Sequence, residues 1–235
     1  MIFFDVITIF PEILDSYLKE SILARAEKKK LIKIKFHNLR EYTDDRYQMT
    51  DDRPYGGGSG MVLKIEPIFK ALKAIKLKAK NKKAKIILFS PRGKVLNQQT
   101  IDRYSRLDQL IMICGRYEGI DERVNKLVDE VVSVGDYILM GGELPAITVV
   151  ESVSRLIPGV LGVLDELKNK SKARIKERKK ELKEHIWGFT DFPQYTRPEV
   201  FSVDGKKKWR VPKELMTGNH KKIKEWREKH TKMRN

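Results

Sequence analysis

Three short glycine-containing segments carry the residue types that line ligand sites. Ser90–Gly93 (SPRG), Cys114–Val124 (CGRYEGIDERV) and Ser133–Pro145 (SVGDYILMGGELP) each follow a run of apolar residues. Glycine lets backbone amide and carbonyl groups come close to a ligand, because it has no Cβ atom and tolerates positive φ. Leucine and methionine side chains in the last segment can form an apolar wall. Together the segments predict one crevice shared by three strand ends.

The elements that must position these segments follow from the hydrophobic pattern. From Met1 to about Pro158, short apolar runs alternate with amphipathic stretches, which is typical of a mostly parallel sheet with helices on both faces. Helices are expected from Pro11 and from Pro67, because a first helical turn accepts proline. The predicted strands are Ile2–Ile9, Leu31–His37, Lys85–Phe89, Leu110–Cys114 and Glu130–Val134.

The composition changes after this α/β region. Residues 165–185 hold nine Lys and Arg against five Asp and Glu with little to bury, which predicts a linker or a solvated helix. An aromatic, proline-punctuated stretch follows from Trp187, and the chain ends in a predicted helix capped near Asn219. This tail is too short to fold alone, so we expect it to pack on another domain or on a partner.

The net charge points to a polyanionic partner. The chain has 49 Lys and Arg against 32 Asp and Glu, a formal charge of +17. Residues 161–235 alone contain 22 basic and 11 acidic residues, so most of the excess lies in the last third. Phosphates bind such surfaces through release of counterions. A proteome that favours lysine is the alternative explanation, but the uneven distribution favours a partner.

Several other functional classes are disfavoured. One cysteine allows no intrachain disulfide and no multi-cysteine zinc site, and four scattered histidines lack ligand spacing, so no metal site is predicted. The N-terminus resembles a first strand more than a signal peptide. No apolar run approaches the roughly 20 residues that span a bilayer. We therefore expect a cytoplasmic protein without a membrane partner.

The GGGSG string at 56–60 could suggest a phosphate cradle, but it matches neither G-x-G-x-x-G nor G-x-x-x-x-G-K-[ST]. It follows Asp51–Tyr55 rather than a strand, and no Lys-Ser or Lys-Thr pair follows it. A flexible gate over a site or a contact to nucleic acid is favoured over a nucleotide cradle, and simple turn chemistry is the remaining alternative.

Two single residues have ordinary and functional interpretations. Cys114 ends an apolar strand, where a free thiol behaves as a small hydrophobic group rather than as a nucleophile. Arg155 follows the glycine segments in an apolar context, ESVSRLIPG. Taken alone, it is more simply a helix-capping or salt-bridging arginine.

Aromatic and basic residues alternate in the tail. Aromatic faces stack on unpaired bases and cations bind phosphates, which is how proteins recognise structured or single-stranded RNA. A small aromatic core with solvated lysines is an equally good interpretation. The residues concerned are Trp187, Phe189, Phe192, Tyr195, Trp209, Arg197, Lys206, Lys207, Lys208 and Arg210.

At these residues the chain resembles the bacterial tRNA (guanine-N(1)-)-methyltransferase family. The likeness runs from the first strand to the end of the chain, and its motifs are long, ordered and correctly spaced. Besides the three glycine-containing segments, they are DDRPYGGGSGM (51–61), SVSRLIPGVLG (152–162), QYTRPEV (194–200) and GNH (218–220).

The resemblance implies the architecture. It implies a SPOUT-class α/β domain with a deep trefoil knot over 1–162, a flexible charged linker over 163–187, and a small helical tRNA-binding domain over 188–235. It also implies a homodimer with the active site at the subunit interface and the tRNA lying across both subunits.

The resemblance further implies S-adenosylmethionine as cofactor, held by the knot loops. It places substrate contacts on Asp51, Arg53, Gly58, Tyr195 and Arg197. The implied cofactor contacts are Leu88, Ser90, Pro91, Gly93, Gly115, Tyr117, Glu118, Gly119, Ser133, Val134, Gly135, Asp136, Tyr137, Ile138, Leu139, Gly141, Gly142 and Pro145.

The implied reaction methylates the guanine just 3′ of the anticodon. Arg155 matches the family arginine that could stabilise the guanine carbonyl as N(1) loses its proton. The family's general base is an aspartate before Ser and Phe in the linker, and this chain lacks that string. We therefore predict Glu184 as the base, with Glu181 and Asp191 as rivals.

Two alternatives stay open from the sequence. A knotted methyltransferase could act on another RNA base or on a ribose hydroxyl, and the missing linker aspartate would also suit an RNA-binding factor that has lost catalysis. The sequence does not decide whether a magnesium ion assists.

Overall fold

The computed structural model describes residues 1–57, 59–78, 83–161, 193–202 and 208–230. The chain divides into two compact units, Met1–Lys168 and Asn169–Asn235. The division falls inside the predicted linker, residues 163–187, which lies outside the described residues. The predicted domain boundaries therefore remain predictions.

The first unit is built on a five-stranded sheet in which all neighbouring strands are parallel. Its strand order is β2-β1-β6-β5-β7, so all five strands predicted from the apolar runs are present. A separate two-stranded antiparallel ladder joins β3 and β4. The sheet strands are β1 Ile2–Thr8, β2 Ile32–Asn38, β5 Ala84–Val95, β6 Gln109–Ile113 and β7 Glu130–Ser133, and the ladder strands are β3 Asp51–Asp52 and β4 Val62–Leu63.

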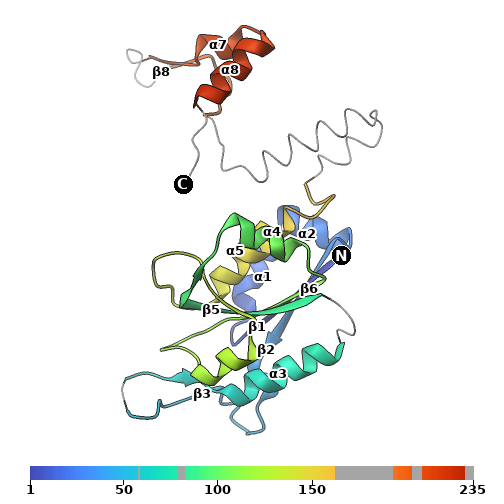
Figure 1. Cartoon of the computed structure of the whole chain (residues 1–235), viewed down its shortest axis with the longest axis vertical. Helices are drawn as coiled ribbons and strands as arrows, with labels where there is room; N and C mark the ends of the chain where they lie inside the picture. The colour runs from blue at the N-terminus through green and yellow to red at the C-terminus, as the bar shows by residue number, and fades with distance from the viewer. Residues whose placement is uncertain (58, 79–82, 162–192, 203–207, 231–235) are drawn as a thin grey trace. The chain divides into compact units, whose positions relative to one another are not determined.

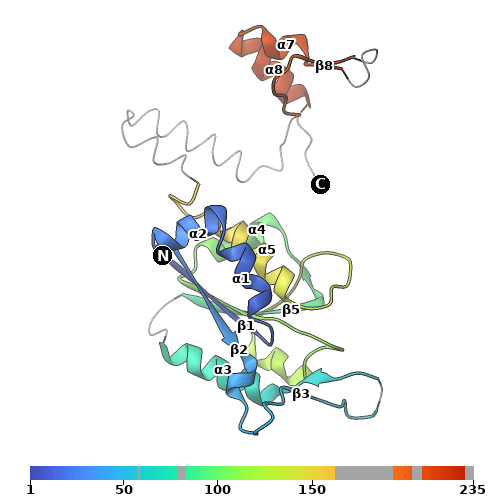
Figure 2. The ribbon, with the colours of Figure 1, turned by 180° about the vertical axis from the view of Figure 1, so that it is seen from behind.

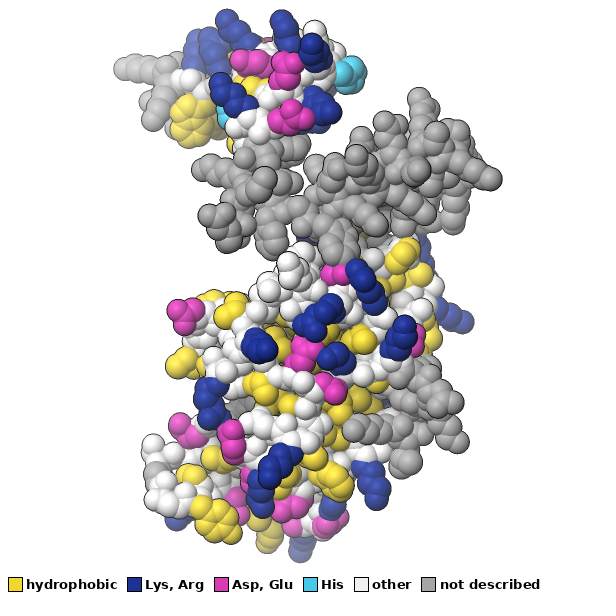
Figure 3. Space-filling view, viewed as in Figure 1, with side chains coloured by type: hydrophobic (Ala, Val, Ile, Leu, Met, Phe, Trp, Pro, Cys, Tyr) yellow, Lys and Arg dark blue, Asp and Glu magenta, His cyan; other side chains and the backbone are white. Residues whose placement is uncertain are grey.

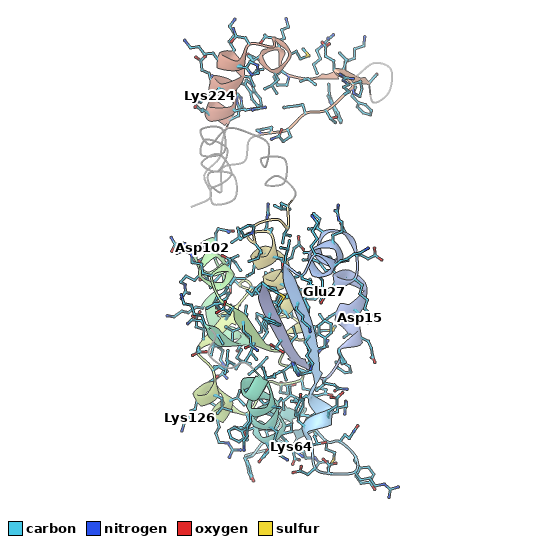
Figure 4. All side chains as sticks on the ribbon, turned by 90° about the vertical axis from the view of Figure 1, so that its right-hand side faces the viewer. Asp15, Glu27, Lys64, Asp102, Lys126 and Lys224 are labelled. Carbon is cyan, nitrogen blue, oxygen red and sulfur yellow. The ribbon has the colours of Figure 1, made fainter. Side chains whose placement is uncertain are left out.

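Helices cover both faces of the sheet, as the hydrophobic pattern predicts (Figure 1). One core cluster joins the sheet to α1 Glu12–Leu18, α2 Ser21–Lys28, α4 Gln98–Ser105 and α5 Glu143–Ser154. The other joins its opposite face to the short helix η1 Leu39–Tyr42, to α3 Ile65–Lys78 and to the short helix η2 Glu122–Leu127. Figure 4 shows this layering, with Asp102 of α4 and Lys126 of η2 on opposite sides of the sheet.

Side chains of successive strand residues alternate between these two layers. In β6, Leu110 and Met112 belong to the first cluster, whereas Ile111 and Ile113 belong to the second. This alternation is the period of two expected for a strand, and β6 is buried at every position because both faces are covered. The result is a rigid platform whose edges carry the loops.

The described part of the second unit contains a small antiparallel hairpin and two helices. Strands β8 Val200–Ser202 and β9 Lys208–Arg210 pair with each other, and α7 Lys213–Met216 and α8 His220–His230 follow. Asn219 caps α8, because its side-chain oxygen accepts hydrogen bonds from the amides of Lys221 and Lys222, at 3.1 and 3.2 Å. The predicted cap is confirmed, and the hairpin adds strands to a region predicted as helical.

No helix among the described residues is long and apolar enough to cross a membrane.

Candidate active site

Two of the three glycine-containing segments contact each other at one edge of the sheet. Strands β6, β5 and β7 are parallel neighbours, so their carboxyl ends lie at the same edge, which we call the carboxyl edge. The amide of Gly142 donates a hydrogen bond to the carbonyl of Gly115 at 2.9 Å, and Arg116 forms a β-bridge with Gly141. The segment after β7 therefore returns across the segment after β6.

The third segment, Ser90–Gly93, differs from the expectation that it ends a strand. It lies inside β5, where the pairing with β7 breaks at Phe89 and resumes at Lys94. A Cβ atom on Gly93 would lie 2.5 Å from the backbone nitrogen of Val132, so only glycine allows this close pass. Pairing with β7 could not be foreseen from the apolar run alone, which stops at Phe89.

A buried carboxylate joins three parts of the carboxyl edge. Glu143, in the first turn of α5, accepts a hydrogen bond from the Thr8 hydroxyl at 2.7 Å. Its other oxygen accepts from the Arg116 Nε at 3.0 Å, and that guanidinium lies 5.0 Å from the centre of the Phe10 ring. The cluster links the end of β1, the segment after β6 and the start of α5.

This cluster also explains the state of Cys114. Its thiol is buried in the core, where burial raises its pKa well above the ordinary value. The negative charge of Glu143 raises this pKa further, and the guanidinium of Arg116 acts in the opposite direction. The thiol is therefore a small buried hydrophobic group, as the sequence predicts, and is not a nucleophile.

Residues 136–140 offer a ligand both backbone groups and apolar side chains. Within the described chain, their amides donate no hydrogen bond to another residue. The side chains of Tyr137, Ile138, Leu139 and Met140 are exposed. Unpaired amides and exposed apolar groups in one loop form a surface that can take an amphipathic ligand.

The predicted gate is tied to the same edge. Met61 accepts a hydrogen bond from the amide of Glu118, and Leu63 bridges Ile120. Asp51 pairs with Leu63 across the β3–β4 ladder, which holds Asp51 near this edge. Arg53 is exposed just beyond the ladder, and Gly58 lies outside the described residues.

Arg155 lies away from the carboxyl edge. It follows α5, whose 12 residues span about 18 Å at the usual rise of a helix. It is the C-cap residue of α5, as the helix-capping alternative expects, and its exposed side chain makes no hydrogen bond or ion pair with another described residue. Arg155 is therefore near the opposite end of the helix from Gly141 and Gly142.

Comparisons with known proteins agree with these motifs. The family model described as tRNA (Guanine-1)-methyltransferase TrmD matches residues 2–235. The chain belongs to this family. It is 44% identical over 229 residues to a tRNA (guanine-N(1)-)-methyltransferase of Dictyoglomus turgidum, covering 97% of this chain and 84% of that protein. It is 46% identical over 224 residues to the protein of that name in Prochlorococcus marinus, covering 95% and 83%.

The fold agrees with a solved member of the tRNA (guanine-1)-methyltransferase family. The crystal structure of tRNA (m1G37) methyltransferase from Aquifex aeolicus matches with a TM-score of 0.74 at 36% identity. The match covers 97% of this chain and 88% of that one, so it includes both units.

Against this family pattern, the structure gathers only part of the predicted site. The predicted cofactor residues lie along β5, after β6 and after β7, within the first unit. Tyr195 and Arg197 lie in the second unit, and Glu184 and Asp191 lie outside the described residues, as does Glu181. Sequence reasoning missed Thr8, Arg116 and Glu143. Arg116 and Glu143 lie inside two of the glycine-containing motifs, and that position could have identified them as site residues. No motif includes Thr8.

Proposed function

We propose that this chain transfers a methyl group from S-adenosylmethionine to N(1) of the guanine immediately 3′ of the tRNA anticodon. The observation that carries this proposal is the family match over residues 2–235, which includes every glycine-containing segment at the carboxyl edge. The basic composition of the chain suits a tRNA partner. Since tRNA is the substrate, we propose that the enzyme works in the cytoplasm.

The carboxyl edge suits S-adenosylmethionine as cofactor. The amides of residues 136–140, which donate to no other described residue, can bind its polar groups, while exposed Ile138 and Leu139 can contact the adenine ring. The cofactor supplies an electrophilic methyl group when bound. The predicted cofactor residues listed above are the ones that we propose to hold it, and the return of residues 133–142 across 114–116 supports the proposed trefoil knot.

The remaining chemistry needs a base and a cation. Removing the N(1) proton of guanine requires a general base within hydrogen-bond reach, and we propose the carboxylate of Glu184 for that role, with Glu181 and Asp191 as rivals. The guanidinium of Arg155 would stabilise the negative charge that builds on the guanine carbonyl. In the described ranges, no group of three or more His, Cys, Asp or Glu residues is arranged to hold a metal ion.

The position of Arg155 supports a homodimer with a shared site. Within one chain, Arg155 lies about a helix length from Gly142. Figure 2 shows α1 beside α5, and Tyr17 of α1 donates a hydrogen bond to Glu151 of α5. Ile13, Tyr17 and Leu144 expose large apolar side chains on these two helices. An antiparallel pairing through this face would bring Arg155 of a second copy toward the carboxyl edge of the first.

The activity is tested directly with unmodified tRNA transcript. Incubation with S-adenosylmethionine, followed by nucleoside mass spectrometry, should yield 1-methylguanosine. A transcript with adenosine in place of that guanosine should yield none. A methylated ribose or a different methylated base would support the alternative knotted methyltransferase. Binding of tRNA without binding of S-adenosylmethionine, measured by calorimetry, would support a non-catalytic factor.

The shared site is tested by mixing two inactive variants. Arg155→Ala removes the cation, and Gly141→Val removes the loop geometry because its side chain would displace Arg116. If the site is shared, a mixed dimer has one site with an intact loop and an intact arginine, so activity returns. If both groups act within one chain, no mixture regains activity.

The general base is tested separately under single-turnover conditions. Glu184→Gln should slow methyl transfer with little change in cofactor affinity, whereas Glu181→Gln and Asp191→Asn, at the rival carboxylates, should slow it less. Near-normal transfer by Glu184→Gln, with a loss in Asp191→Asn, would move the role to Asp191.

A further inference from the structure

The aromatic residues of the second unit fall into two groups with different surroundings. Trp226 of α8 is only 8% exposed, with the Tyr195 ring edge-on at 6.1 Å and the His230 ring stacked at 4.1 Å between centroids. Phe201 and Trp209 are 52% and 55% exposed. The sequence left a small aromatic core and an RNA-binding surface as equal alternatives. In the first group only Trp226 is buried, and Tyr195 is itself 48% exposed, whereas both rings of the second group lie on the surface.

The exposed pair stands on one face of the hairpin. Phe201 of β8 and Trp209 of β9 are directly opposite in the antiparallel register, and their ring centroids are 6.0 Å apart with a tilt of 33°. Because side chains alternate along a strand, Lys208 and Arg210 stand on the other face beside Trp209. Two rings thus lie side by side on one face of the hairpin, and two cations lie on the other.

The charge of the second unit favours a nucleic acid over an apolar partner. The described residues of the second unit include only four carboxylate side chains, at 199, 214, 225 and 228. Figure 3 shows Lys and Arg side chains across the visible face of this unit, with hydrophobic groups exposed among them. The nine cationic residues are Arg197, Lys208, Arg210, Lys213, Lys221, Lys222, Lys224, Arg227 and Lys229.

We propose that the Phe201–Trp209 pair is a stacking platform for an unpaired nucleobase of the tRNA substrate. A base has an aromatic face that stacks on either ring, whatever its identity, while Lys208 and Arg210 on the other face add positive charge that attracts the phosphates. This platform presupposes the proposed function, because tRNA is the ligand.

The cross-strand pair also stabilises the hairpin itself, and this role must be separated from base stacking. Aromatic pairs of this kind strengthen two-stranded sheets even where no ligand binds. A substitution that removes a ring can therefore weaken RNA binding by loosening the hairpin. The test needs a conservative replacement and a direct measurement of hairpin integrity.

The experiment measures the affinity of the full chain for an unmodified anticodon stem-loop by fluorescence anisotropy, without cofactor. Trp209→Leu should weaken binding about tenfold, the effect of losing one stacked base, with an unchanged salt dependence. Trp209→Phe keeps a ring and should restore most of the affinity. Lys208→Gln is the matched control on the same strand, and it should lower the slope of log affinity against log salt by about one. Hydrogen exchange of the β8 and β9 amides checks the hairpin.

Abasic nucleotides introduced singly into the loop identify the stacked base. At that position alone, the abasic change should weaken binding by the normal chain but not by Trp209→Leu.

Wild-type affinity in both Trp209→Leu and Phe201→Leu, with hairpin exchange preserved, would overturn the platform. A change in sedimentation, or in the stability of the first unit, caused by Trp209→Leu or Phe201→Leu would also overturn it. Such a change would mean that the rings pack on a second copy of the chain or on the first unit. Methyl transfer is assayed separately, so failure of the proposed function shows as absent 1-methylguanosine with ring-dependent binding intact.

Discussion

Two edges of the same sheet carry the same chemical grouping in different settings. At the carboxyl edge, Glu143 accepts from the Thr8 hydroxyl and from Arg116. At the opposite edge, Glu130 at the start of β7 accepts from the Tyr104 hydroxyl at 2.8 Å and pairs with Lys85 and Arg103. Each edge thus has a carboxylate, a hydroxyl and a cation.

The two groupings differ in burial and in their neighbours. The Glu143 side chain is 2% exposed against 21% for Glu130. Glycines at 141 and 142 adjoin Glu143 in the chain, whereas the glycine nearest to Glu130 in the sequence is Gly135, five residues later. At the Glu130 edge the ion pairs tie together packed elements. At the carboxyl edge the pair holds backbone loops that can face a ligand, so similar polar contacts serve stability at one edge and site architecture at the other.

The largest difference should appear when each carboxylate is removed. Glu143→Ala leaves Arg116 without its partner in a mostly buried place, so we expect a loss of about 3 kcal/mol in unfolding free energy. Glu130→Ala should cost about 1 kcal/mol, since its cationic partners reach solvent. Urea unfolding measures both.

Cofactor affinity provides the second half of this comparison. Calorimetry at a temperature where both variants are folded should show weaker binding of S-adenosylmethionine by Glu143→Ala and unchanged binding by Glu130→Ala. Equal losses of affinity in the two variants would mean that the carboxyl edge is not specially organised for the ligand.

A smaller effect is expected from the glycine contacts at the carboxyl edge. A Cβ atom on Gly142 would lie 2.6 Å from the Cα of Cys114, whereas one on Gly115 would meet only ordinary contacts, at 3.5 Å from Ile120. Gly142→Ala should therefore cost about 2 kcal/mol through overpacking. Gly115→Ala is the matched control and should leave thermal unfolding nearly unchanged. A tolerant Gly142→Ala would show that the two segments are not held in close contact.

Local sequence patterns predict much of this architecture. The runs Lys85–Phe89 and Leu110–Cys114 are apolar because both faces of the sheet are covered, and Asn219 precedes a helix as its cap. The three-residue strands β8 and β9 escape such patterns, because too few residues alternate to distinguish them from a loop.

Contacts between distant parts of the chain limit what the sequence reveals about the site. Thr8 and Glu143 are 135 residues apart, and a glutamate in the first turn of a helix is normally expected in solvent beside the helix dipole. Its burial depends on Arg116, which the sequence alone does not place nearby. The break in β5 at Ser90–Gly93 likewise depends on a partner strand about 40 residues later.

The smallest expected effect concerns acid stability at the Glu130 edge. Burial raises the pKa of Glu130, but the hydrogen bonds from Lys85 and Tyr104 outweigh this effect. In the folded protein, the pKa of the Glu130 carboxyl is therefore below the ordinary value of 4.5. As the pH falls below about 4.5, the unfolded chain takes up this proton first, so the stabilisation present at neutral pH is progressively lost. Glu130→Gln should therefore reduce the fall in unfolding free energy between pH 5 and pH 3, measured by urea titration.

Asp15→Asn, which removes an exposed i, i+4 pair with Lys19, is the control and should change this fall less. An identical pH profile in Glu130→Gln and the unmodified protein would show that the contacts at this edge do not favour the charged carboxylate.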